Sequence, residues 1–101
     1  TAYDKYSDVI DEILRSIIDK GRGIELNTAG FKYGLGHPNP TEEILKRYHS
    51  LGGEIITVGA DAHKPGHVAY DFDKVPDILK DAGFKYYTVF ENRIPHFLKI
   101  D

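Results

Sequence analysis

The sequence predicts an α/β fold built from three βα-type units whose strands run parallel. The first observation is a rhythm, because segments with strand character begin at Ile24, Ile55 and Tyr86, 31 residues apart each time. The second is that a loop, an amphipathic helix and a glycine separate one strand from the next, which is the order of βα units that feed a parallel sheet. Three or four parallel strands do not close a barrel or cover both faces of a sheet. We therefore expect the chain to be part of a larger barrel or to pair with copies of itself, and we prefer the first hypothesis.

The first predicted element is a helix over residues 6–21. Acidic side chains lie early in it and Lys20 lies late, the favourable order for a helix dipole, and Gly21 and Gly23 supply the stop. Apolar residues recur at three- and four-residue intervals and predict one wide apolar stripe. The stripe consists of Tyr6, Val9, Ile10, Ile13, Leu14, Ile17 and Ile18.

A short strand and a second helix follow. Residues 24–27 alternate apolar and polar side chains, as a strand does. After a glycine- and proline-rich loop, Asn39 is the predicted N-cap of a helix with Pro40 at its first position. The buried side of this helix is predicted to be Ile44, Leu45, Tyr48 and Leu51.

The remaining elements repeat this order once and then change. Residues 54–60 are the next predicted strand, and residues 74–83 a helix capped by Asp73 with Pro76 in its first turn. Its buried face is predicted to be Val75, Ile78, Leu79 and Ala82. A strand over residues 85–90, a turn and a final strand over residues 96–100 complete the chain.

Composition excludes several classes of protein. The net charge of −3 and the scattered basic residues argue against a nucleic-acid partner. No apolar run reaches the roughly 20 residues that span a bilayer, so no membrane partner is expected. The absence of cysteine excludes disulfides and thiolate metal sites, and it fits a cytoplasmic protein.

The segment TVGADAHKP, residues 57–65, carries the main candidate site. Asp61 and His63 lie two residues apart where a strand ends, and the carboxyl ends of parallel strands are where ligands bind in such folds. A carboxylate and an imidazole without thiolates suit Zn, Mn or Fe in a hydrolytic role. From spacing alone, a capping aspartate beside a solvated loop histidine is the more frequent arrangement.

Other polar residues border the same strand ends. Glu25 and Asn27 share the polar face of their strand. They either bind substrate or brace a ligand, or else Glu25 makes an internal ion pair and Asn27 begins the turn. Lys32 and Lys64 are cations that suit an anionic group such as phosphate, although surface lysines are common. His67 is expected to lie at the surface or behind the ligands, because Pro65 and Gly66 oppose a helix there.

The motifs IELNTAG and TVGADAH, with the helix between them, resemble the C-terminal part of the PHP (polymerase and histidinol phosphatase) superfamily, closest to its histidinol-phosphatase branch. The resemblance covers essentially residues 1–101 as a single segment. It implies the C-terminal portion of a distorted (β/α)7 TIM-like barrel with two or three divalent metal ions. It places the last metal motif on Asp61 and His63, and it makes Asn27 and Lys32 candidate substrate-binding residues.

The implied activity is metal-dependent hydrolysis of L-histidinol phosphate, a small-molecule phosphate ester, in histidine biosynthesis. The other metal ligands of the family have no counterpart in this sequence, so we expect the chain to be a C-terminal fragment that is inactive alone. Two alternatives stay open: a phosphoesterase for another phosphate ester, and a non-catalytic α/β module that oligomerises. Uncovered sheet faces and edges also predict self-association.

Overall fold

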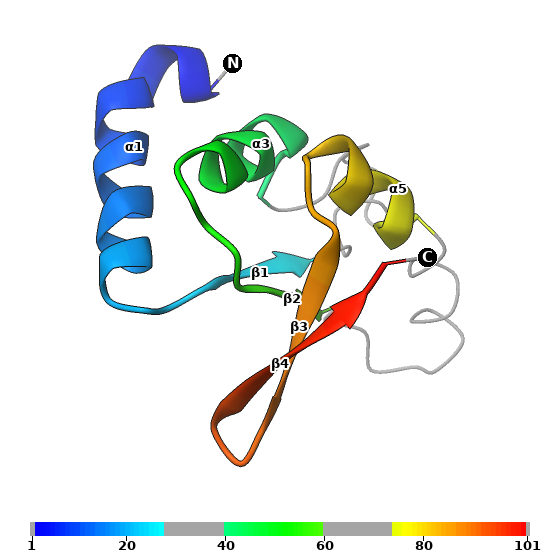
Figure 1. Cartoon of the computed structure of the whole chain (residues 1–101). Helices are drawn as coiled ribbons and strands as arrows, with labels where there is room; N and C mark the ends of the chain where they lie inside the picture. Colours follow the sequence, from blue (N-terminus) through cyan, green and yellow to red (C-terminus); the bar gives the residue numbers. More distant parts are fainter. Residues whose placement is uncertain (1, 28–39, 60–73, 101) are drawn as a thin grey trace.

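The computed structural model describes residues 2–27, 40–59 and 74–100, and it is a mixed α/β structure. Its elements are α1 (Ala2–Asp19), β1 (Ile24–Asn27), α3 (Glu42–Ser50), β2 (Ile56–Gly59), α5 (Val75–Asp81), β3 (Tyr86–Glu91) and β4 (Ile94–Lys99). Figure 1 shows α3 and α5 on the same side of the strands, α1 at one edge, and the β3–β4 hairpin extending away from the helices. Among these residues no helix is long and apolar enough to cross a membrane.

The first two strands form the predicted parallel pair. β1 and β2 align Ile24 with Ile56, Glu25 with Thr57, Leu26 with Val58 and Asn27 with Gly59. Leu26 and Ile56 are fully buried, whereas Glu25 is exposed, so the alternation in sequence separates a core side from a polar side.

The prediction that the third strand joins a parallel sheet is wrong. Within the part of the chain that the structure describes, β3 pairs only with β4, in antiparallel register from Tyr86↔Lys99 to Glu91↔Ile94. Asn92 and Arg93 both have positive φ, 52° and 66°, the backbone that a two-residue hairpin turn requires. This tight reversal brings β4 beside β3, and no TIM-barrel arrangement is seen in the described residues.

β3 meets β2 through a side chain instead. The Ile56 backbone N–H donates a hydrogen bond of 3.1 Å to the Thr88 hydroxyl, and Thr88 is 2% exposed. The hydroxyl therefore satisfies a buried edge donor of β2 that a neighbouring strand would otherwise bond.

The buried faces of α3 and α5 are confirmed, and they build the core with the parallel pair. The core comprises Leu14, Leu26, Leu45, Tyr48, Ile56, Val75, Leu79, Ala82, Phe84 and Ile100. The Tyr48 hydroxyl donates to the Ile55 carbonyl at 2.8 Å, which gives this buried phenol a polar partner.

Both predicted helix caps are wrong by one or two residues. α3 begins after Thr41, whose extended backbone (φ −66°, ψ 161°) and carbonyl, which accepts a hydrogen bond from the Leu45 N–H, make it the N-cap in place of Asn39. α5 begins after Lys74 rather than Asp73, with Pro76 in the first turn as predicted. Asn39 and Asp73 themselves lie outside the described residues.

α1 begins four residues earlier than predicted and bends at Tyr6 (φ −124°, ψ 27°). Its apolar stripe is only partly covered. Leu14 is buried and Ile10, Ile17 and Ile18 pack against the core, whereas Tyr6, Val9 and Ile13 remain more than half exposed.

Candidate functional site

The carboxyl edge of the β1–β2 pair is the candidate site. Parallel register sets Asn27, the last residue of β1, directly beside Gly59, the last residue of β2. Asp61 and His63 follow Gly59 by two and four residues in the sequence. The site therefore rests on two strand ends that the structure brings together.

A carboxylate from the polar side of the pair also reaches this edge. A Cβ atom at residue 59 would collide with the Glu25 carboxylate, so the side chain of Glu25 lies across Gly59. Glycine is the residue that lets the carboxylate approach the β2 backbone this closely. The Thr57 hydroxyl, on the same side, donates weakly to the Ile24 carbonyl at 3.5 Å.

These observations decide one alternative for Glu25. No hydrogen bond or ion pair joins Glu25 to another residue of the described ranges, so the predicted internal ion pair is not present there. Asn27 is half-buried and does have an interaction partner.

Three of the four predicted site residues, Asp61, His63 and Lys32, lie outside the described residues. Within the residues that are described, no three carboxylate or imidazole groups gather closely enough to hold a metal ion. Lys64 and His67 also lie outside them, while His49 and His96 lie on α3 and β4, off the β1–β2 pair. A metal centre at this edge would thus depend on Asp61 and His63, whose oxygen and nitrogen donors suit Zn, Mn or Fe.

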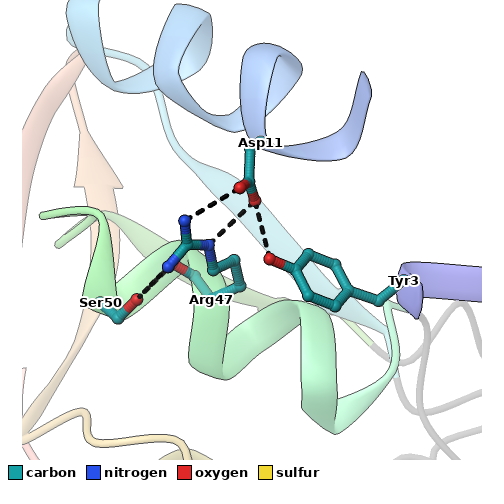
Figure 2. A network of polar contacts seen from close by, with 4 residues as sticks. All are labelled: Tyr3, Asp11, Arg47 and Ser50. Carbon is teal, nitrogen blue, oxygen red and sulfur yellow. Dashed lines mark hydrogen bonds and ion pairs between the residues drawn. The ribbon is translucent and has the colours of Figure 1, made fainter. Parts of the chain in front are cut away.

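A polar network of the described residues lies elsewhere, between α1 and α3 (Figure 2). Arg47 donates from Nε and Nη2 to the two Asp11 carboxylate oxygens, each at 2.9 Å, and the Tyr3 hydroxyl donates to Oδ1 of Asp11 at 3.0 Å. Arg47 also donates to the Ser50 hydroxyl at 3.4 Å. Sequence reasoning missed this pair, because its two members are 36 residues apart and no local spacing announces them.

The network shifts the titration of its members. Hydrogen bonds from Arg47 lower the pKa of the Asp11 carboxyl, and the same pairing raises the pKa of Arg47. Desolvation, followed by the hydrogen bond to Asp11, raises the pKa of Tyr3. The charges of Asp11 and Arg47 therefore neutralise one another, and the network joins α1 to α3 rather than presenting a reactive group.

Comparison with known proteins relates most of the chain to histidinol-phosphatases. It is 39% identical over 83 residues to a probable histidinol-phosphatase of Thermotoga maritima, a match that covers 81% of this chain and 35% of that protein. It is 33% identical over 95 residues to a probable histidinol-phosphatase of Clostridium acetobutylicum, covering 91% of this chain and 35% of the relative. A histidinol-phosphatase of Lactococcus lactis subsp. lactis is 29% identical over 97 residues, covering 93% and 33%.

No family model matches the sequence. The chain spans about a third of the length of the curated relatives it matches. Over that third, the chain is related in sequence to the histidinol-phosphatases.

Proposed function

We propose that this chain forms part of a metal-dependent histidinol-phosphatase of the PHP superfamily, which hydrolyses L-histidinol phosphate to L-histidinol and phosphate. The observation that carries the proposal is the similarity to three curated proteins named for this activity, over 81–93% of the chain. The placement of Asn27 beside Gly59, at the edge where the Asp61 motif begins, supports a site in the same place.

Each residue has a role in this proposal. Asp61 and His63 would hold divalent metal, either Zn, Mn or Fe, in the oxygen and nitrogen environment that these ions accept. The ion would supply positive charge that lowers the pKa of a water molecule and offsets the charge of the phosphate. Hydrolysis joins the water oxygen to phosphorus and breaks the ester P–O bond, and the alcohol leaves with a proton.

Substrate binding would fall to Asn27 and Lys32. The side-chain amide of Asn27, at the end of β1, offers both a donor and an acceptor to a phosphate or hydroxyl group. The Lys32 ammonium would pair with the phosphate as a compact point charge. Glu25, which reaches the same edge, adds negative charge that favours a bound cation.

Two protein ligands do not make a competent hydrolytic site, since catalytic zinc sites use three protein ligands and an open position. We therefore propose that the 101-residue chain alone does not turn over histidinol phosphate. Activity would require further ligands of the kind that a whole histidinol-phosphatase supplies.

A chimera tests the function. The matched segment of the Thermotoga maritima protein is replaced by this chain, and phosphate release from L-histidinol phosphate is measured with added Zn²⁺ or Mn²⁺. We expect turnover in the chimera and none in the isolated chain. Asp61→Ala should abolish turnover and reduce bound metal, while Asp77→Ala, at an exposed position of α5, should change neither.

Three outcomes would overturn parts of this proposal. A folded Asp61→Ala chimera with full activity would remove Asp61 from the site. A chimera that releases phosphate faster from another ester in a panel of phosphomonoesters would move the assignment to the alternative phosphoesterase. Turnover by the isolated chain, with tightly bound metal, would contradict its proposed incompleteness.

A further inference from the structure

The described surface of α1 carries an uncovered apolar stripe. Tyr6, Val9 and Ile13 are 53%, 57% and 54% exposed. They recur at i, i+3 and i+7, the spacing by which an amphipathic helix anchors in an apolar groove. Leu14, on the covered side of α1, is 4% exposed, so the helix already uses a different side for the core of this molecule.

The β3–β4 hairpin carries apolar side chains on both faces. Opposed residues of an antiparallel pair share a face, so the register groups Tyr86, Phe90 and Phe97 on one face, called here the aromatic face. Val89, Ile94 and Leu98 occupy the other, the aliphatic face. All six are at least 43% exposed, which is far more apolar surface than a two-stranded hairpin normally leaves in water.

A hollow of about 590 Å³ lies beside the aromatic face. It is lined by His49, Glu54, Gly83, Phe84, Lys85, Tyr86 and Phe97. The His49 ring meets the Phe84 ring edge-on, with centroids 4.9 Å apart, and this contact forms part of the wall. A groove of this size with an aromatic wall suits the apolar side chains of a helix.

Contact through the faces is favoured over contact through the strand edge. Ile100 donates its backbone N–H to the Lys85 carbonyl, so these two residues form a hydrogen-bonded pair. Hydrogen-bonded and non-hydrogen-bonded pairs then alternate along the hairpin from this point. Pro95, Phe97 and Lys99 then direct their backbone groups to the outer edge of β4. Because Pro95 has no N–H and Lys99 is charged, this edge resists pairing with another strand.

Charge favours α1 as the element that fills the groove. α1 carries five carboxylates and two cations, Lys5 and Arg15, and after Arg47 neutralises Asp11 it stays net negative. Residues 85–100 carry Lys85, Arg93 and Lys99 against the single carboxylate Glu91, so the hairpin is net positive, and it stays so when Glu54 of the groove wall is counted. Contact between two hairpins or between two copies of α1 would join like charges, whereas contact of hairpin with α1 joins opposite ones.

We propose that two copies of this chain associate reciprocally, with α1 of each copy lying in the groove beside the aromatic face of the other. The occupant of the groove is thus a second copy, and its anchors are Tyr6, Val9 and Ile13. Such an exchange is isologous, since each copy contributes the same two surfaces. This proposal does not rest on the phosphatase activity proposed above.

Sedimentation velocity of the 101-residue chain over a range of concentrations tests it, with circular dichroism to confirm that each variant folds. We expect a reversible monomer–dimer equilibrium. Phe97→Ser in the groove and Val9→Ser on α1 should each weaken dimerisation by at least about tenfold. Leu98→Ser is the matched control, because Leu98 adjoins Phe97 with similar exposure but lies on the aliphatic face, and it should leave the equilibrium unchanged.

A charge exchange distinguishes this contact from other modes of association. Glu12→Lys on α1 and Lys85→Glu in the groove should each weaken the dimer at low salt, and the double variant should recover most of the loss. A monomeric wild-type chain at high concentration would overturn the proposal, as would a dimer that Phe97→Ser weakens and Val9→Ser does not. A chain that stays monomeric and binds the part of the Thermotoga maritima relative outside the matched segment would assign the groove to a different occupant.

Discussion

At the scale of single residues, the structure separates groups that hold elements together from groups that face the candidate site. Arg47 and Asp11 form two parallel hydrogen bonds between α1 and α3, the geometry that gives arginine–carboxylate pairs their strength. Glu25 and Asn27 instead lie at the carboxyl end of the parallel pair, where the sequence predicts ligand binding. Sequence spacing found the second group, because its members are close along one strand, and missed the first.

The Arg47–Asp11 pair predicts a pH dependence of stability. Arg47 lowers the pKa of Asp11 below its usual value in the folded state. A carboxyl group with a depressed folded pKa stabilises the fold above its unfolded pKa, and this stability is lost as pH falls through the folded pKa. Arg47→Ala should therefore lower the denaturation midpoint at pH 7, and the difference from wild type should shrink on acidification below about pH 4.

Urea unfolding followed by circular dichroism between pH 2 and pH 7 measures this difference. Lys46→Ala is the matched control, because Lys46 is exposed on α3, lies outside the hydrogen-bonded network and is not a cause of the lowered Asp11 pKa. A deficit in Arg47→Ala that stays constant down to pH 2 would show that the ion pair is not its cause.

At the scale of elements, the order and type of the segments follow from their patterns, while the partner of the third strand does not. β1 and β2 are short apolar segments separated by a helix, and they pair in parallel as predicted. β3 is followed after two residues by β4, and the positive φ of Asn92 and Arg93 turns the chain back at once. Since loop closure over two residues costs less entropy than pairing over a long connection, the hairpin forms locally.

The hydrogen bond to the Thr88 hydroxyl joins β2 to β3, and its removal is expected to lower the stability of the fold. Thr88→Val keeps the size and strand preference of the side chain but leaves the buried Ile56 N–H without its acceptor. We expect a loss of about 1–3 kcal/mol in the free energy of unfolding. Thr57→Val, which removes only a long hydrogen bond at a half-buried position, should cost clearly less in the same denaturant titration. Equal costs would mean that the Ile56 N–H finds another partner.

At the scale of the whole molecule, side chains from α3, α5 and the parallel pair meet in one core. Leu45 and Tyr48 from α3, Leu26 and Ile56 from the parallel pair, and Leu79 from α5 are all fully buried. The hairpin lies largely outside this core, because every residue of β4 and most of β3 are exposed, and Figure 1 shows it extending away from the helices. The core thus stabilises the helices and the parallel pair, while the hairpin exposes apolar surface.

This division predicts that a Leu→Ala substitution has unequal effects on stability in the core and in the hairpin. Leu45→Ala should cost about 2–5 kcal/mol through lost burial and a cavity, a large fraction of the roughly 5–15 kcal/mol of a typical domain. Leu98→Ala, at 43% exposure on β4, should cost much less. Thermal and denaturant unfolding at low protein concentration measures both, and comparable losses would place the hairpin inside the cooperative core.

The sequence by itself determined the type and order of the elements, the buried faces of α3 and α5 and the strand end at which Asp61 and His63 follow. These features depend on local periodicity and on turn residues, which neighbouring positions set. Only the tertiary structure decided that β3 turns back on β4, that Thr88 bonds the β2 edge, that Arg47 joins Asp11, and that Tyr6, Val9 and Ile13 stay uncovered. The hairpin depends on the positive φ of Asn92 and Arg93, and the other three features depend on which distant segments pack together; local periodicity specifies neither.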